Sequence, residues 1–398
     1  MKKKLLIVYP HMMLGGSTTS LISFIKNLNF DEFDVDLQLF ENNGKYIDYI
    51  PENIRLLPPA KKHKSNFSKC VHFLISGYFF KALFAGLKRK RLALSSAVKG
   101  EFIAKKGSKR NKNHYDYAVG FLEGWSDRYL AYGVKADKKY AWLHSTFANI
   151  TRNPAAELPW MEKVDKIVFV TDACRDDFKK SMPQMAQKAV TIENITDSAL
   201  IRKRSEEIPQ SDREYERFAS CEKTKIITVC RVDIKTKGLD RILNSAIKLK
   251  ESGCEFLWYI IGSGPDTDAL SCKVSEKGLS DTVIPIGIRM NPYPFIKTAD
   301  IMCMPSRYEG KPMVITESMI LGTPPLVTKY LSAEEQIKNG VEGIIVENEE
   351  DTITAPLMDL ILNPEKISFM KANLLSNDYG NTSYMSVIEK TLFNKGDI

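Results

Sequence analysis

Residues 302–324 read MCMPSRYEGKPMVITESMILGTP. A short apolar run that ends at Met304 is followed by Pro305, and Pro312 then precedes a second apolar segment. Proline is favoured at the first position of a helix, so the stretch predicts a strand, a loop and a helix. Glu309 lies in the loop and Glu317 lies eight residues later. Because an α-helix repeats every ~3.6 residues, both carboxylates can face the same side.

The start of this predicted helix is a candidate anion site. The backbone N–H groups of Met313 and Val314 have no partner within the helix, and the helix dipole favours negative charge there. Gly310 and Lys311 come directly before that turn. The stretch therefore predicts a site for an anionic group such as a phosphate.

Working outward, the second half alternates strands with helices and predicts a parallel sheet. The expected strands are residues 225–229, 256–261, 283–286, 301–304 and 325–328, with helices at 239–249 and 266–277. Ligands of such sheets bind at the carboxyl ends of the strands. Gly262 lies at one of these ends, and Arg231 and Lys237 follow another. Arginine and lysine there suit a diphosphate, although a solvated loop would also carry such residues.

The first half repeats the pattern. Its expected strands are residues 5–9, 35–39, 117–121, 139–143, 166–170 and 190–194, the last of which ends at Asn194. Gly15 and Gly16 follow the first strand, where glycine lets a ligand approach the backbone or simply makes a turn. His144 follows the fourth strand, where its imidazole could meet a substrate or be structural. Together the halves predict an α/β protein of two facing Rossmann-like domains with a cleft between them.

Length and composition fit this organisation. The 398 residues suffice for two domains, and 43% hydrophobic with 27% charged residues is typical of globular proteins. We expect an N-terminal, acceptor-binding domain at 1–202, a linker at 203–222, a C-terminal domain at 223–375, and a helical segment at 376–398 that returns to the first domain. The seven cysteines lack CxxC spacing, so no zinc site or disulfide framework is expected.

Positive charge is concentrated in one segment. Residues 61–112 hold fifteen Lys or Arg and one acid, Glu101, although the whole chain has a net charge of only +8. The segment also contains an aromatic run at 73–84 and the cluster at 88–91. Cations beside apolar side chains suit contact with an anionic membrane surface. A solvated helical excursion is the alternative, and no nucleic-acid-binding motif is present.

Two pairs of aspartates have the spacing of a metal site. Asp34 and Asp36 lie in an expected strand, and Asp266 and Asp268 begin an expected helix. Two cations can neutralise the phosphates in place of a metal, so no metal and no cofactor are expected.

The ordered motifs resemble those of the family 4 retaining glycosyltransferases of GT-B fold, in particular the bacterial capsular or exopolysaccharide branch. The matching pieces are Gly15-Gly16, residues 141–144, 170–172, 192–194, Arg231 with Lys237-Gly238, residues 260–265, Glu309-Gly310, residues 316–318, 322–324 and 339–343.

This resemblance implies roles for several residues. Glu317 would hold the donor ribose, Glu309 would meet the transferred sugar, and Arg231 and Lys237 would neutralise the diphosphate. His144 would lie by the reacting carbon. Two positions depart from the family pattern: Lys311-Pro312 replaces an aromatic-glycine pair, and Leu331-Ser332 stands where a glycine pair is common.

The implied activity is transfer of a hexose, with retention, from a UDP-sugar to a glycan or a polyprenyl-diphosphate-linked acceptor in cell-surface polysaccharide synthesis. We expect a cytoplasmic protein at the inner face of the cell membrane, with no nucleic-acid partner. A UDP-sugar epimerase and a non-catalytic partner subunit of a glycosyltransferase are the alternatives.

Overall fold

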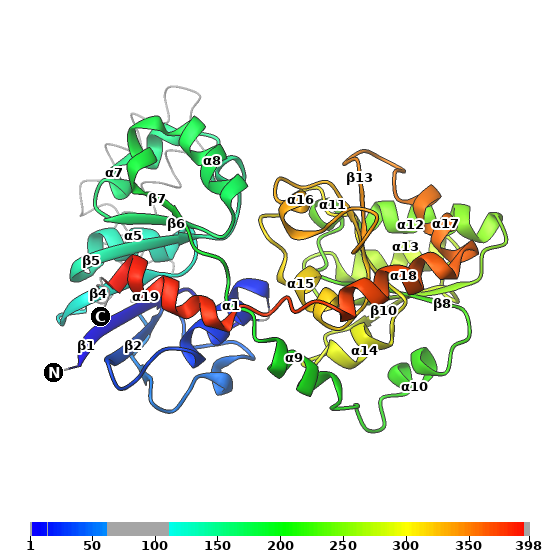
Figure 1. Ribbon diagram of the computed structural model, residues 1–398, viewed down its shortest axis with the longest axis horizontal. Helices are drawn as coiled ribbons and strands as arrows, with labels where there is room; N and C mark the ends of the chain where they lie inside the picture. Colours follow the sequence, from blue (N-terminus) through cyan, green and yellow to red (C-terminus); the bar gives the residue numbers. More distant parts are fainter. Residues whose placement is uncertain (1, 14, 62–110, 394–398) are drawn as a thin grey trace, which may run out of the picture. The chain divides into compact units, whose positions relative to one another are not determined.

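The computed structural model describes residues 2–13, 15–61 and 111–393. The chain forms two compact units, shown in Figure 1. Unit 1 comprises residues 1–194 together with 383–398, and unit 2 comprises residues 195–382. Each unit has its own sheet and its own core.

Unit 1 is built on a seven-stranded parallel sheet with the order β3-β2-β1-β4-β5-β6-β7. Its strands are β1 (Lys3–Tyr9), β2 (Phe33–Leu39), β3 (Arg55–Leu56), β4 (His114–Gly120), β5 (Lys135–Leu143), β6 (Lys166–Phe169) and β7 (Ala189–Thr191). Leu5 through Val8 in the interior strand β1 are fully buried, as expected for a parallel sheet that is covered on both faces.

The described helices of unit 1 connect these strands and supply apolar side chains to its core. They are α1 (Gly16–Lys26), α5 (Trp125–Gly133), α6 (Phe147–Ile150), α7 (Leu158–Met161) and α8 (Asp172–Ser181), with 3-10 turns at Ile47–Tyr49, Pro154–Ala156 and Pro183–Lys188. Tyr129 of α5 and Phe178 of α8 pack in the same buried cluster as Phe169 of β6.

The last described helix also belongs to unit 1. Helix α19 (Met385–Phe393) follows the 3-10 turn Thr382–Tyr384. The ring of Phe393 lies 4.9 Å from the rings of both Phe33 and Tyr117, and the Tyr117 hydroxyl donates to the Phe393 carbonyl at 2.9 Å. The C-terminal segment is therefore part of the core of unit 1.

Unit 2 is built on a six-stranded parallel sheet with the order β10-β9-β8-β11-β12-β13. Its strands are β8 (Thr224–Val229), β9 (Phe256–Ile261), β10 (Val283–Gly287), β11 (Ile301–Met304), β12 (Pro325–Thr328) and β13 (Ile344–Val346). Its helices are α9 (Ser198–Ser205), α10 (Arg213–Ala219), α11 (Ile234–Lys237), α12 (Leu239–Glu251), α13 (Thr267–Glu276), α14 (Tyr293–Thr298), α15 (Met313–Ile320), α16 (Ala333–Gln336), α17 (Thr354–Leu362) and α18 (Pro364–Leu375). Both sheets are Rossmann-like, which confirms the expected α/β class.

The structure has a packed helix where the sequence predicts a linker at residues 203–222. Helix α10 lies inside this range, and Phe218 is fully buried in a cluster with Tyr259 and Phe295. The low apolar content of the segment is offset by a few well-placed side chains that complete the core of unit 2. The change of unit instead occurs between Asn194 and Ile195.

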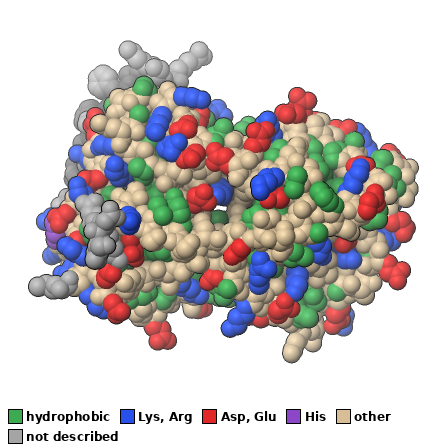
Figure 2. All heavy atoms as spheres, viewed as in Figure 1, with side chains coloured by type: hydrophobic (Ala, Val, Ile, Leu, Met, Phe, Trp, Pro, Cys, Tyr) green, Lys and Arg blue, Asp and Glu red, His purple; other side chains and the backbone are tan. Residues whose placement is uncertain are grey.

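Most of the basic segment at 61–112 lies outside the described residues, so the expected membrane contact stays a prediction. Within the described ranges, no helix combines the length and the apolar character needed to cross a bilayer. On the face drawn in Figure 2, blue cationic and red acidic side chains are interspersed over the surface.

Candidate functional site

The candidate site in unit 2 lies where the strand order changes direction. Strands β8 and β11 are neighbours in the sheet, yet the chain leaves them toward opposite edges. The carboxyl ends of strands at such a point form a crevice in which ligands of open α/β sheets bind. Arg231 follows β8 and Glu309 follows β11, so both loops belong to this edge.

Arg231 supplies an available positive charge. Its side chain is exposed, and it makes no ion pair or hydrogen bond with any residue that the structure describes. The neighbouring Asp233 caps α11 by accepting the N–H of Thr236 at 2.9 Å. That bond is the main cause that lowers the pKa of Asp233, with smaller contributions from Arg231 and Lys237. The loop thus combines a fixed helix cap with an accessible guanidinium group.

Lys237 and Glu309 form an ion pair across the two loops. The Lys237 Nζ lies 2.6 Å from Glu309 Oε1, and the side chains are only 22% and 11% exposed. Breaking such a partly buried pair would leave one charge uncompensated, which is costly. Two of the four residues predicted as catalytic, Lys237 and Glu309, are therefore brought together, but as each other's partners and not as separate groups.

A close backbone approach fixes the geometry of these loops. Gly238 has a φ of +65°, and a Cβ atom there would lie 2.0 Å from the carbonyl oxygen of Pro305. The Arg307 N–H donates to the Thr236 carbonyl at 2.9 Å, and its guanidinium binds both Asp240 oxygens at 2.8 and 2.9 Å. The loops after β8 and β11 consequently form one rigid element.

The start of α15 presents unsatisfied backbone donors at the same edge. Pro312 is the N-cap, and the N–H groups of Met313 and Val314 have no acceptor among the described residues. Just before the helix, the carbonyl of Gly310 accepts the Ser332 hydroxyl, and the carbonyl of Pro312 accepts the Gln336 amide at 3.1 Å. Lys311 is half-buried in this turn. Two aligned donors on a held turn can bind an anion.

Gly262 shapes the loop that adjoins Arg231. Its φ is +139°, and a Cβ atom would lie 1.9 Å from the carbonyl oxygen of Cys230. The next loop residue, Ser263, accepts the Val232 N–H at 3.0 Å through its carbonyl. Glycine is therefore required at position 262 to let the two strand ends approach each other.

Glu317 is buried within unit 2. Its side chain accepts the Tyr293 hydroxyl at 3.2 Å, and the residue is only 7% exposed. Burial raises the pKa of Glu317 to about 7, while the bond from Tyr293 and the charge of Arg204 oppose this rise. A buried carboxyl group with a shifted pKa, here on helix α15, is a candidate for a functional residue. Tyr293 was not predicted, because its contact with Glu317 joins residues far apart in the sequence.

Unit 1 has its own change of direction, between β1 and β4. Gly16 begins α1, and the Gly15 carbonyl accepts the N–H groups of Thr18 and Thr19 at 3.1 and 3.0 Å. A Cβ atom at Gly15 would meet nothing within 4 Å, so packing does not require glycine there. The Tyr9 hydroxyl, at the end of β1, lies 2.8 Å from Ser17 Oγ.

His144 lies at this edge of the first sheet, directly after β5. Its Nε2 lies 3.1 Å from the Phe121 carbonyl, and its backbone N–H donates to Glu123 Oε2 at 2.9 Å. Burial lowers the pKa of His144, an effect that the negative charge of Glu123 opposes. Glu123 was missed by sequence reasoning, although it follows the apolar strand β4 just as His144 follows β5. Asn194 instead joins two segments, since its side-chain oxygen accepts the buried Ser20 hydroxyl at 2.7 Å.

The aspartate pairs have structural partners. Asp36 is 1% exposed and binds Arg55 at 2.7 and 2.8 Å and the Tyr115 hydroxyl at 2.6 Å. Asp266 accepts the Ile234 N–H at 2.8 Å. No cluster of three or more potential metal ligands occurs among the residues in the described ranges.

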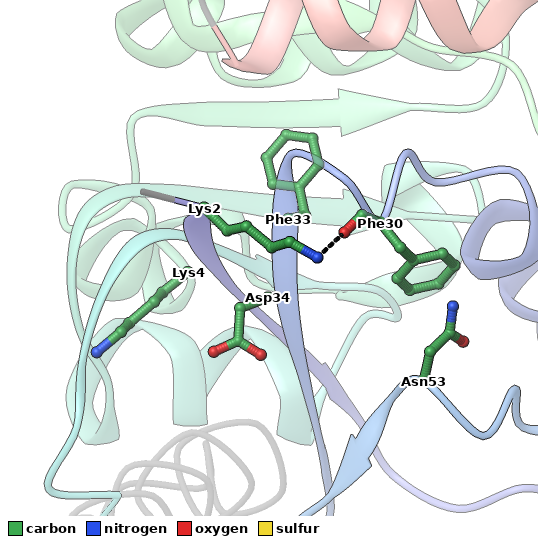
Figure 3. Close-up of a pocket in the computed structure, with 6 residues that line it drawn as sticks. All are labelled: Lys2, Lys4, Phe30, Phe33, Asp34 and Asn53. Carbon is green, nitrogen blue, oxygen red and sulfur yellow. Dashed lines mark hydrogen bonds between the residues drawn. The ribbon is translucent and has the colours of Figure 1, made fainter.

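A cavity of about 340 Å³ lies away from these loops (Figure 3). It is lined by Lys2, Lys4, Phe30, Phe33, Asp34 and Asn53. Lys2 Nζ donates to the Phe30 carbonyl at 2.7 Å, as the dashed line shows. The cavity adjoins the amino-terminal ends of β1 and β2, the edge of the sheet opposite to Tyr9, so we assign it no role.

Comparison with known proteins gives these features a context. Residues 211–374 match the family model of the glycosyl transferases group 1. This range contains Arg231, Lys237, Glu309 and Glu317, so the candidate site of unit 2 lies within the part of the chain that is similar to this family.

Individual relatives are distant. The alpha-D-kanosaminyltransferase of Streptomyces kanamyceticus is 23% identical over 48% of this chain and 49% of its own. The chain thus spans about half the length of this relative. A longer match, 22% identical over 89% of this chain and 88% of the relative, is to the Campylobacter jejuni N-acetylgalactosamine-N,N'-diacetylbacillosaminyl-diphospho-undecaprenol 4-alpha-N-acetylgalactosaminyltransferase.

Solved structures share the fold. Anabaena HepE in complex with UDP and glucose has a TM-score of 0.71 at 14% identity, covering 98% of this chain and 100% of that one. WaaG, a glycosyltransferase involved in lipopolysaccharide biosynthesis, has a TM-score of 0.66 at 14% identity, covering 97% and 99%. The expected GT-B architecture of two Rossmann-like units is confirmed.

Proposed function

We propose that this protein is a glycosyltransferase that moves a hexose from a nucleoside diphosphate sugar to a hydroxyl group of a glycan or lipid-linked acceptor. The observation that carries this proposal is the convergence of Arg231, the Lys237–Glu309 pair and the free N–H groups of α15 at one edge of the sheet of unit 2. A guanidinium group and helix-start donors together suit a diphosphate.

In the proposed reaction, negative charge develops on the departing diphosphate. The bond between the anomeric carbon and the diphosphate oxygen breaks, and a new bond forms between that carbon and the acceptor oxygen. The acceptor proton leaves with the diphosphate. Arg231 and the start of α15 would stabilise the departing negative charge more than the bound donor, which lowers the barrier. Glu309, held by Lys237, would accept a hydrogen bond from a sugar hydroxyl, and Glu317 would hold the ribose.

A UDP-sugar is the proposed donor, and no metal or cofactor is invoked. The HepE structures contain UDP and UDP-glucose, which supports uridine nucleotides as the class to test first. Retention of anomeric configuration is proposed from the resemblance to retaining family 4 enzymes. Nuclear magnetic resonance of the first product formed from a donor of known anomer would test it.

A lipid-diphosphate-linked acceptor at a membrane surface completes the proposal. The name of the Campylobacter relative includes a diphospho-undecaprenol substrate, which supports a lipid-linked acceptor. Residues 88–91 of this chain are four consecutive cations, which support contact with an anionic membrane surface. Replacing Lys88, Arg89, Lys90 and Arg91 by glutamine should release the protein from anionic vesicles. Unchanged binding at moderate salt would remove the membrane contact from the proposal but leave the transferase activity open.

The decisive experiment incubates the purified chain with a panel of nucleotide sugars and measures released nucleotide, with and without a membrane lipid extract. We expect release from one donor to rise strongly when the extract is present. Conversion of the donor sugar without nucleotide release would favour the epimerase. Nucleotide binding without turnover under any condition would favour a non-catalytic subunit.

A further inference from the structure

Glu123 occupies a defined place at the edge of the first sheet. It lies three residues after the end of β4, and His144 is the first residue after β5. The two strands pair in parallel, with Gly120 opposite Ala141. One carboxylate and one imidazole are thereby brought together at the carboxyl ends of adjacent strands.

The hydrogen bonds that Glu123 and His144 already make determine which of their atoms can accept a further hydrogen bond. A carbonyl oxygen only accepts, so His144 Nε2 must carry the proton that it donates to Phe121 at 3.1 Å. In the neutral ring, Nδ1 is then an acceptor. Glu123 uses Oε2 to accept the His144 N–H at 2.9 Å, and its Oε1 has no partner within the described part of the chain.

Two charged residues of α5, Asp127 and Arg128, lie near Glu123, and the guanidinium group of Arg128 is engaged by other partners. Glu123 acts electrostatically on Tyr9, whose hydroxyl is already bonded to Ser17, and on Asp127, which is fully buried at the start of α5. Arg128 is directed to the Gly124 carbonyl at 2.9 Å and to Glu157 at 2.8 Å. A phosphate would therefore be repelled here, whereas a neutral ligand rich in donors would be bound.

We propose that Glu123 and the Nδ1 atom of His144 accept hydrogen bonds from hydroxyl groups of a sugar, which makes Glu123 a substrate-binding residue of unit 1. This inference rests on the proposed glycosyltransferase function. The hydroxyl groups belong either to the sugar of the donor or to the acceptor sugar, since both present the same chemistry.

The test uses the full chain and its Glu123→Gln variant, which keeps an oxygen for the His144 N–H but removes the charge. Calorimetry measures binding of UDP and of the active UDP-sugar identified by the panel. Turnover of that donor is measured with water and with the lipid extract as acceptor. Glu162→Gln, which removes one exposed carboxylate from the same unit, is the matched control.

We expect the variant to bind UDP within twofold of the wild type and to lose at least tenfold in transfer. If hydrolysis by water falls equally, the bound hydroxyl belongs to the donor sugar; if only transfer falls, it belongs to the acceptor. Transfer within twofold of the wild type would overturn the inference. If the wild type binds no nucleotide at all, the proposed function fails first, and the two failures are thus distinguishable.

A second variant and the melting temperatures of both variants distinguish a lost substrate contact from a folding defect. Glu123→Asp keeps the charge but shortens the side chain, so it should lose the bond to His144 and reduce transfer without changing UDP affinity. If both variants melt as the wild type does and transfer is intact in both, Glu123 binds no substrate.

Discussion

The two sheets end in edges of the same topology but of opposite chemistry. In unit 2, the edge offers an exposed guanidinium group at Arg231 and the N–H groups of Met313 and Val314, which have no acceptor in the described part of the chain. In unit 1, the corresponding edge offers the acceptors of Glu123 and His144. The fold therefore provides the same kind of sheet edge in each unit, but the side chains at the strand ends decide which ligand class each edge could bind.

The largest loss of activity is expected when the exposed cation Arg231 of unit 2 is removed. Arg231→Ala should lower kcat/KM about 100- to 1000-fold, as does the loss of one donor that stabilises developing charge in other enzymes. Lys235→Ala is the control, because Lys235 is an exposed cation on the adjacent helix α11. Steady-state kinetics on both variants would check this, and equal losses would show that only overall charge matters.

A smaller effect is expected when the ion pair of unit 2 is broken. Glu309→Gln should lower kcat about 10- to 100-fold through the loss of a transition-state contact. UDP binding should be unchanged or tighter, because Lys237 would then be free to meet the phosphates. Calorimetric titration with UDP measures this directly, and clearly weaker binding by a stable variant would contradict the assigned role of the pair.

Glu317 should make the stability of unit 2 depend on pH. Its folded-state pKa of about 7 exceeds the ordinary value of 4.5, so the folded protein holds this proton more tightly than the unfolded chain. The free energy of unfolding should fall as the pH rises through that window, by on the order of 3 kcal/mol from this group.

The Glu317→Gln variant removes this dependence. It should match the wild type near pH 4.5 and become more stable than the wild type near pH 8, while losing affinity for UDP. Urea denaturation at both pH values measures the difference. A difference that does not change with pH would show that Glu317 titrates normally.

His144 should give the smallest effect, of opposite sign. Burial lowers its pKa below the ordinary 6.5, so the unfolded chain binds the proton more tightly than the folded one. The wild type should therefore lose stability relative to His144→Gln as the pH falls below about 6.5, and the two should converge above it. Parallel denaturation curves across this range would contradict the assigned burial.

The sequence predicted the strands well where apolar runs were continuous, as in residues 256–261, 301–304 and 325–328, which coincide with β9, β11 and β12. The loops that follow them were predicted for the same reason, since residues after a strand in a parallel sheet reach its carboxyl edge. Arg231, Lys237 and Glu309 were found in this way.

Other features depend on contacts that no local pattern encodes. The burial of Glu317 is set with Tyr293 and α14, and the pairing of Lys237 with Glu309 joins residues 72 positions apart. Helix α10 has the composition of a linker, because only Phe218 and a few neighbours carry its packing. In each case a tertiary contact outweighs the composition of the segment.

The return of α19 to unit 1 has a consequence for how such a chain can be modified or recombined. Residues 195–382 form one uninterrupted insert, and the aromatic contacts of Phe393 with Phe33 and Tyr117 lie wholly outside it. Two crossover points in the gene, near codons 195 and 382, would exchange the whole of unit 2 while leaving the core of unit 1 intact. A single crossover would instead pair one parent's α19 with the other parent's Phe33 and Tyr117, so two-point chimaeras should fold more often than one-point chimaeras.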